Sequence, residues 1–235
     1  GWLSHMRGDD ARAQALLEES LSLWRRVGDP RGLAFALNFM SGVAEARGAI
    51  DEMIPLLQES ITVSAQHGDR WAHGSSLNAL GQLLLSQGEV AEAKACFEQS
   101  LSLFQEIGEP SGQARALLGQ SGILRREGRC GAARSVIVQA LHLGHNAQNR
   151  AIQLQGLLEL AVVLADEQKE PEALELLMVA LPEATATLEP ASVSTYEALR
   201  QALQARLAPE VSAAARTRAA ASSVEAHVAE LIGPR

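Results

Sequence analysis

One segment of this sequence recurs along the chain at a constant step of 40 residues. Its five copies begin at Leu16, Leu56, Cys96, Val136 and Leu176, and no insertion interrupts the spacing. Units that repeat at a fixed period of tens of residues pack on their neighbours and bury a continuous core together. The period therefore predicts an array of one repeated structural unit.

Glycines mark the ends of the unit's helices. One series falls at Gly8, Gly48, Gly88 and Gly128, and a second at Gly28, Gly68 and Gly108. Glycine just after a helix takes the left-handed conformation that satisfies the last carbonyls without a Cβ clash. After Gly28, Asp29 and Pro30 supply an N-cap acceptor and a proline at the first helical position. We predict that each unit is a helical hairpin, its first helix ended by the first series and its second helix by the other.

Apolar and small residues keep the same phase. An apolar residue recurs at one position of each unit: Leu17, Leu57, Phe97, Ile137 and Leu177. Small residues recur where the two helices of a hairpin must approach closely. They form three series: Ala13, Ala93, Ala133 and Ala173, with Met53 as the exception; Ser20, Ser60, Ser100, Ala140 and Ala180; and Gly1, Ser41, Gly81, Ser121 and Ala161. Each helix is amphipathic, and no strand is expected, so the predicted fold class is all-α.

Composition limits the class of partner. The formal net charge of -8 argues against direct binding of nucleic acid, which needs clustered Lys and Arg. No apolar run approaches the roughly 20 residues that span a bilayer, so no membrane partner is expected and we predict a cytoplasmic location. The two cysteines, Cys96 and Cys130, are too few for a disulfide framework or a structural zinc site, and both fall at apolar positions of the repeat.

The repeat resembles the tetratricopeptide repeat (TPR). One copy of that signature is filled in order by Leu77, Leu80, Gly81, Gly88, Ala93, Phe97 and Ser100. The resemblance implies an α-solenoid, a right-handed superhelix of antiparallel helical hairpins. The period of 40 residues exceeds the usual length of about 34 because the helices around the Gly-Asp turn are longer.

This longer variant resembles the C-terminal TPR domains of bacterial LuxR-type and maltose-regulator-like transcriptional regulators, which belong to the STAND ATPases. The segments ARAQALLEESLSLWRRVGDPRGLAFALN and GDRWAHGSSLNALGQLLLSQGE carry the resemblance. It implies a sensor or interaction module of a bacterial signalling protein, covalently linked to an N-terminal regulatory domain. Because Gly1 falls in the middle of a first helix, we expect that the chain is an excised fragment.

A single solenoid domain is predicted over residues 1–235. It comprises a truncated repeat (1–29), four repeats (30–69, 70–109, 110–149 and 150–189) and a degenerate C-terminal capping hairpin (190–235). The outer helix of that hairpin is polar enough to cap an array, since it carries Arg216, Arg218, Ser222, Ser223, Glu225 and His227. About eleven full helices are expected, with Leu3 to Arg7 as the remnant of another.

The TPR resemblance implies that the first helix of each hairpin lines a concave, partner-binding groove. Carried over by position, the groove-facing residues are Trp2, Phe35, Asn38, Phe39, Gly42 and Ala46, then Ser75, Asn78, Ala79, Gln82 and Ser86, then Arg115, Leu118, Gly119, Gly122 and Arg126, and finally Gln155, Leu158, Glu159, Val162 and Asp166. We select Trp2, Phe35, Asn38, Phe39, Asn78, Gln82, Arg115 and Arg126 as candidate ligand-binding residues.

For each group of candidate residues, a structural role is the alternative to ligand binding. Asn38 and Asn78 resemble the asparagine ladder of arrays such as those of kinesin light chain, where amides pair with the backbone of an extended peptide; they could instead bond neighbouring helices. Arg115 and Arg126 could bind a carboxylate or phosphate, or pair with Glu159 and Asp166 of the next hairpin.

The aromatic residues of the set have an alternative too. Trp2, Phe35 and Phe39 could hold an apolar side chain of a partner, or Trp2 could be exposed only because its own hairpin is cut.

Catalytic chemistry is not indicated. His142 and His145 lie three apart on one helix, but no third metal ligand follows in sequence. No phosphate loop and no nucleophile-base motif is present, so we expect no enzyme activity, no metal and no cofactor. The predicted function is the binding of a protein, a peptide or a small effector, with homo-oligomerisation as the alternative.

Overall fold

The computed structural model describes every residue except 1–3, 5–8, 189 and 234–235, and it describes residues 190–192 by their backbone alone. Gly1, Trp2, Gly8 and most of the predicted remnant from Leu3 to Arg7 therefore lie outside the described residues. The chain divides between Gly112 and Gln113 into two compact units, each of which is described here by itself.

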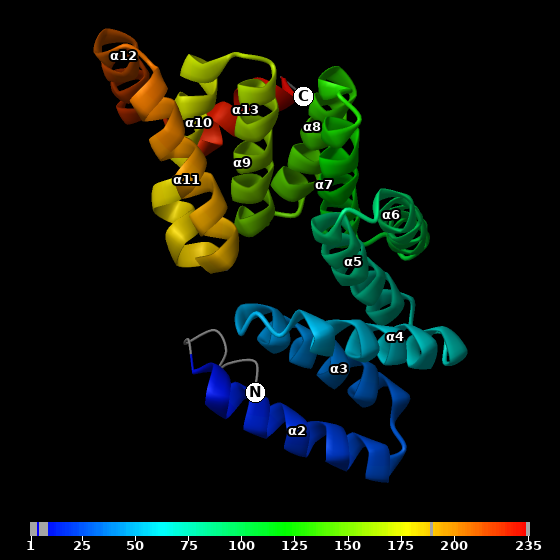
Figure 1. The fold of residues 1–235 in the computed structure, drawn as a ribbon. Helices are drawn as coiled ribbons and strands as arrows, with labels where there is room; N and C mark the ends of the chain where they lie inside the picture. Colours follow the sequence, from blue (N-terminus) through cyan, green and yellow to red (C-terminus); the bar gives the residue numbers. More distant parts are fainter. Residues whose placement is uncertain (1–3, 5–8, 189, 234–235) are drawn as a thin grey trace. The chain divides into compact units, whose positions relative to one another are not determined.

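Helices account for nearly all of the described chain (Figure 1). Their bounds are α2 (Asp10–Val27), α3 (Pro30–Ala46), α4 (Ile50–Gln66), α5 (Arg70–Gln87), α6 (Val90–Glu106), α7 (Pro110–Arg126), α8 (Cys130–Asn146), α9 (Arg150–Asp166), α10 (Glu170–Thr187), α11 (Pro190–Arg206), α12 (Pro209–Ala220) and α13 (Val224–Ile232). The described residues contain no strand, which confirms the all-α class. Within them, every helix is too short or too polar to cross a membrane.

The glycine turns are as predicted. Six of the glycines, from Gly28 to Gly128 at intervals of 20, have φ angles between 67° and 90°. The series then ends, yet Gln148 (φ 51°) and Gln168 (φ 63°) take the same left-handed conformation at the next two turns. A side chain with a Cβ is strained there by about 1–2 kcal/mol, so the packing of α8, α9 and α10 holds these two turns where the sequence no longer favours them.

Side-chain caps fix the start of the first helices. The Asp29 carboxylate accepts hydrogen bonds from the backbone N–H groups of Arg31 (3.0 Å) and Gly32 (3.4 Å), as the Asp-Pro signal predicts. Asp69 caps α5 through the N–H of Ala72, and Asn149 caps α9 through that of Ile152. Each cap stabilises its helix by about 1 kcal/mol.

The small residues lie where the helices of a hairpin touch. Ser60 donates a hydrogen bond to the carbonyl of Ala34 (3.1 Å), and Ser100 donates one to that of Gly74 (2.8 Å). Both serines are fully buried. Their hydroxyls therefore join the second helix of a hairpin to the backbone of the first while keeping the two helices close together.

The two cysteines differ. Cys96 is buried, as expected for a core position, and burial raises the pKa of its thiol. Cys130 is only partly buried, because it is the first residue of α8. The expectation of a core position is thus wrong for Cys130.

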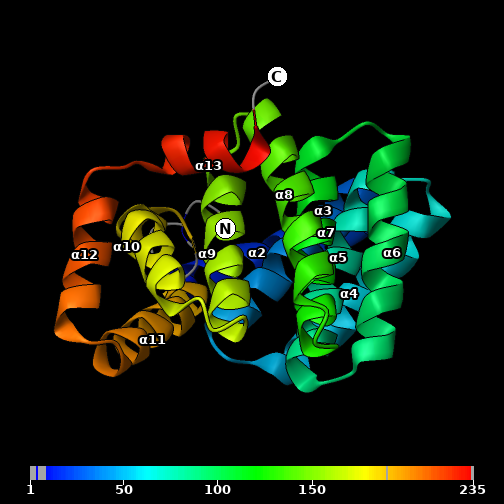
Figure 2. The ribbon, with the colours of Figure 1, turned by 90° about the horizontal axis from the view of Figure 1, so that it is seen from above.

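Residues 190–232 form three helices where the sequence predicts two. The expected outer helix breaks after Ala220, because Ser223 caps a new helix through the N–H of Ala226 (3.2 Å). That helix, α13, buries Val224 and Val228 and packs on α8 and α9 (Figure 2). Burial of these two valines explains why the chain changes direction after α12. The described residues therefore form twelve helices rather than eleven.

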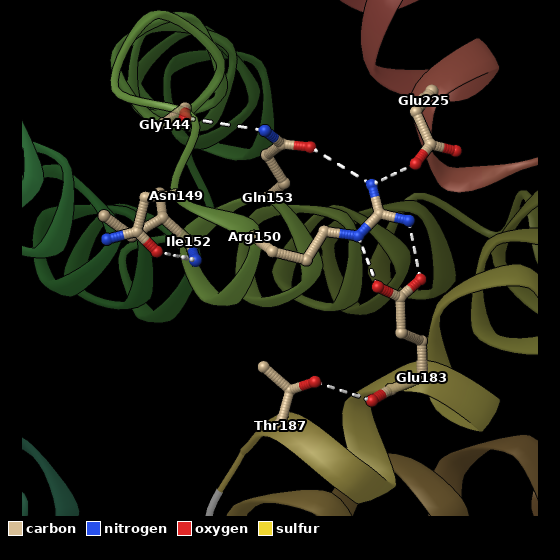
Figure 3. A network of polar contacts seen from close by, with 8 residues as sticks. All are labelled: Gly144, Asn149, Arg150, Ile152, Gln153, Glu183, Thr187 and Glu225. Carbon is tan, nitrogen blue, oxygen red and sulfur yellow. Dashed lines mark hydrogen bonds and ion pairs between the residues drawn. The ribbon is translucent and has the colours of Figure 1, made fainter.

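A polar network holds α13 in place (Figure 3). The guanidinium of Arg150 lies between Glu183 of α10, with Nη2 at 2.6 Å from Oε2, and Glu225 of α13, with Nη1 at 2.8 Å from Oε1. The hydrogen bond with Arg150 is the main reason why the pKa of Glu183 lies below its ordinary value. One side chain at the start of α9 thus connects two helices that come later in the chain.

Candidate partner-binding surface

Three aromatic side chains form one cluster on the first helices α3 and α5. Phe35 of α3 stacks on Trp71 of α5, with ring centroids 4.8 Å apart and planes 7° from parallel. Phe39, one helical turn after Phe35, lies 5.9 Å away at 45°. Phe35 remains 38% exposed. Phe35, Trp71 and Phe39 together form a cluster that we call the aromatic platform, and it presents apolar surface to solvent.

Trp71 is absent from the set predicted from the sequence. It lies one turn before Ser75 and two turns before Asn78, so all three share one stripe of α5. Extending the stripe by one turn toward the N-terminus would have identified it. The sequence-based cluster contained Trp2 instead, and Trp2 lies outside the described residues.

Asn38 uses its amide to join two hairpins. Its Nδ2 donates to the hydroxyl of Ser76 (2.8 Å) and to the carbonyl of Ala72 (3.5 Å), both on α5. The Ser76 hydroxyl in turn donates to Ser60 or to the Ala72 carbonyl. These contacts match the alternative in which the asparagine bonds a neighbouring helix.

Asn78 makes the equivalent contact more weakly. Its Nδ2 lies 3.4 Å from the carbonyl of Gly112, at the start of α7. Its Oδ1 is buried and has no hydrogen-bond partner among the described residues, and the same holds for the hydroxyl of Ser75, one turn earlier. A buried polar atom without a partner costs about 1–3 kcal/mol. Asn78 Oδ1 and Ser75 Oγ are thus two unsatisfied polar atoms on the stripe of α5 that carries Trp71.

Gln82 is the remaining candidate residue of the first unit, and it is exposed. It lies one turn after Asn78 on the same stripe. Trp71, Ser75, Asn78 and Gln82 therefore extend along α5 from a largely apolar end to a polar end. Of the predicted residues, Phe35 and Phe39 contact each other on α3 and Asn38 bonds α5, whereas Asn78 bonds Gly112 instead.

Arg115 and Arg126 belong to α7, in the second unit, and both are exposed. The Oδ2 of Asp166 lies 3.1 Å from Nη1 of Arg125, so its partner is the arginine one position before Arg126. Arg126 makes no hydrogen bond or ion pair with any described residue.

Glu159 has a different partner from the one suggested. Its Oε1 accepts a hydrogen bond of 2.8 Å from the hydroxyl of Tyr196 on α11. Burial raises the pKa of the Glu159 carboxyl, although the Tyr196 hydrogen bond and the charge of Arg125 act in the opposite direction. Burial and the nearby Glu159 raise the pKa of Tyr196 in turn. This pair is a structural tie between α9 and α11 that the sequence did not reveal.

The described residues contain no candidate metal-binding group. Over the described residues, no three side chains of His, Cys, Asp or Glu come together in a way that could hold a metal ion. His142 and His145 thus remain a pair without a third ligand in the described chain.

The comparisons agree with this architecture. A tetratricopeptide repeat model matches residues 32–105 and 73–143. Together these matches span residues 32–143, just under half of the chain. No match is found among curated protein sequences.

Solved structures with TPR-like repeats share the fold. The crystal structure of BtubC (BKLC) from P. vanneervenii is 16% identical, with a TM-score of 0.65, over 96% of this chain and 94% of that one. The nearly identical TPR-like repeats of a putative kinesin light chain from Podosopora anserina are 16% identical, with a TM-score of 0.54, over 83% of this chain and 90% of that one. Identities this low show the fold alone, which is that of a TPR α-solenoid.

The matched family, the tetratricopeptide repeat, is one whose arrays serve as protein-protein interaction modules. The aromatic platform and the α5 stripe lie on α3 and α5, the first helices of two hairpins inside the matched region.

Proposed function

We propose that this array binds an extended segment of a partner protein along α3 and α5, with an apolar side chain of the segment on the aromatic platform. The observation that supports this most is the stacked pair of Phe35 and Trp71, which leaves more than a third of Phe35 in solvent. Aromatic residues are enriched at the centre of protein-protein interfaces.

The polar end of α5 offers hydrogen-bonding groups to the segment. Gln82 is exposed there, so its amide can donate to and accept from the backbone of an extended peptide. Ser75 Oγ and Asn78 Oδ1 are buried without partners among the described residues, so they would bond the peptide only after a local rearrangement. Asn38 would contribute through Ser76 by holding α5 against α3.

The proposed context is that of a sensor. In the regulators that the chain resembles, the array follows a nucleotide-binding switch domain in the cytoplasm of a bacterium. Occupancy of the surface on α3 and α5 would pass to such a domain through the stacked hairpins. Arg115 and Arg126 on α7 are separate candidate positions in the second unit, where a guanidinium group could contact a carboxylate of a partner.

Selection of peptides tests the proposal. Random 12-residue peptides displayed on phage are selected against the whole chain, and the affinities of the selected peptides are then measured by fluorescence polarisation. Phe35→Ala is expected to weaken binding at least tenfold, which corresponds to about 1.4 kcal/mol. Ile107→Ala is the matched control, because Ile107 is also an exposed apolar residue of this unit (41%) but lies at the end of α6.

The outcomes are distinct. Selected peptides that share an apolar residue and depend on Phe35 support the proposal. Peptides that bind the Phe35→Ala variant as tightly as the original chain would place the site elsewhere. Failure to select any peptide against the folded chain would also refute it.

Homo-oligomerisation is a second candidate because α2 exposes apolar side chains. Leu16 (39%), Leu23 (45%) and Val27 (70%) are all open to solvent on this helix. A second copy of the chain could cover them. Light scattering over a range of protein concentrations tests this, and a strict monomer at the highest concentration would contradict it.

A further inference from the structure

A hollow of about 540 Å³ lies in the C-terminal unit, among α10, α11 and α12. Its lining residues are Met178, Arg200, Gln204, Arg216, Ala219 and Ala220. Both α11 and α12 pack on α10, which carries Met178. The hollow is largely open to solvent rather than enclosed, and its volume is within the range of about 300–1,000 Å³ that is usual for small-molecule sites.

The polar part of the lining consists of hydrogen-bond donors. Arg200 donates through Nε to Glu197 Oε2 (2.9 Å) and through Nη1 to Gln204 Oε1 (2.8 Å). These bonds fix the guanidinium and neutralise its charge with that of Glu197. They also occupy the acceptor of Gln204, so the Nε2 donors of that side chain are left for a ligand.

The positive charge of Arg216 has no ion-pair partner among the described residues. The side chain is exposed on α12 and also forms no hydrogen bond with the rest of the described chain. Its neighbour Arg218 instead pairs with Glu175 of α10. No carboxylate is among the residues that line the hollow. In a chain with a net charge of -8, the result is a local positive site.

The rest of the lining is apolar. Met178, Ala219 and Ala220 contribute a flexible thioether and two methyl groups. A thioether side chain adapts to ligands of different shape. The hollow therefore combines donors and one free cation on one part of its wall with apolar surface on another.

From this arrangement we propose that the hollow binds a small organic anion, with its carboxylate or phosphate on Arg216 and Gln204 and its apolar portion against Met178, Ala219 and Ala220. Charge-assisted hydrogen bonds from a guanidinium suit either anion. This site is separate from the surface on α3 and α5 and does not depend on the function proposed for that surface.

Calorimetric titration of the whole chain at low ionic strength tests the site with three probes: phenyl phosphate, benzoate and neutral benzyl alcohol. Both anions are expected to bind more tightly than the alcohol, and their ranking identifies the preferred acid group. Arg216→Gln should weaken both anions at least tenfold. Arg26→Gln is the control, because Arg26 is an exposed arginine of α2 and should leave the affinities unchanged.

A second variant tests the hollow itself. Ala219→Phe keeps every charge but fills part of the volume, so it should weaken both anions while circular dichroism shows an intact helical fold. The proposal is wrong if benzyl alcohol binds as tightly as the anions, if Arg216→Gln leaves the affinities unchanged, or if neither anion binds at millimolar concentration.

Discussion

Gly81 in α5 faces the ring of Phe97 in α6, and this contact leaves no room for a methyl group. A Cβ at residue 81 would lie 2.8 Å from the nearest ring carbon and 3.0 Å from two others. Phe97 is fully buried and cannot move aside freely. Overpacking of this kind costs about 1–3 kcal/mol, whereas replacing glycine by alanine inside a helix gains about 0.5–1 kcal/mol. We therefore expect Gly81→Ala to lower the free energy of unfolding by up to about 2 kcal/mol.

Gly42→Ala is the matched control. Gly42 lies one position further along the repeat, in the middle of α3, and a Cβ there would have no atom within 4 Å. This variant should raise the free energy of unfolding by about 0.5–1 kcal/mol. Urea unfolding followed by circular dichroism measures both variants, and the reasoning predicts opposite signs.

A rescue experiment tests whether overlap with Phe97 causes the loss of stability in Gly81→Ala. In the Gly81→Ala background, Phe97→Leu should cost less than it does in the original chain, by about 1 kcal/mol, because the smaller side chain relieves the overlap. Equal stabilisation by Gly81→Ala and Gly42→Ala would refute the steric explanation. Additive effects of the two substitutions at residues 81 and 97 would refute it as well.

Three further predictions concern the second unit. Because burial raises the folded-state pKa of Glu159, the folded chain binds this proton more tightly than the unfolded chain, and stability should fall as pH rises above the ordinary glutamate value. Glu159→Gln keeps an acceptor for Tyr196 and should flatten this loss in thermal unfolding between about pH 5 and 8; parallel curves would contradict it. Arg150→Gln should speed amide exchange in α13 more than Glu225→Gln does, since Arg150 also bonds α10; equal rates would count against the network. Gln148→Gly should raise the melting temperature by relieving a left-handed turn, a gain of about 1 kcal/mol, and a lower melting temperature would show that the Gln148 side chain itself stabilises the turn.

The candidate surface was only partly predictable. Phe35, Phe39, Asn38 and Asn78 follow from position in the repeat, because a helical stripe can be read from spacing alone. Which atoms remain without partners cannot be read in this way. Asn38 finds Ser76, whereas the oxygen of Asn78 finds nothing in the described chain, and the difference depends on side chains of the next hairpin.

The sequence by itself determined the helical hairpins and their period. Glycine turns, N-caps and apolar spacing are local signals, and they fix helix ends within a few residues. Only the tertiary structure decided what happens where those signals stop. Gln148 and Gln168 take the glycine conformation because their helices are already held by packing, and α13 reverses because burying Val224 and Val228 on α8 and α9 is more favourable than extending α12 into solvent. Local signals depend on neighbours in the chain, whereas these outcomes depend on surfaces that exist only after the hairpins have packed.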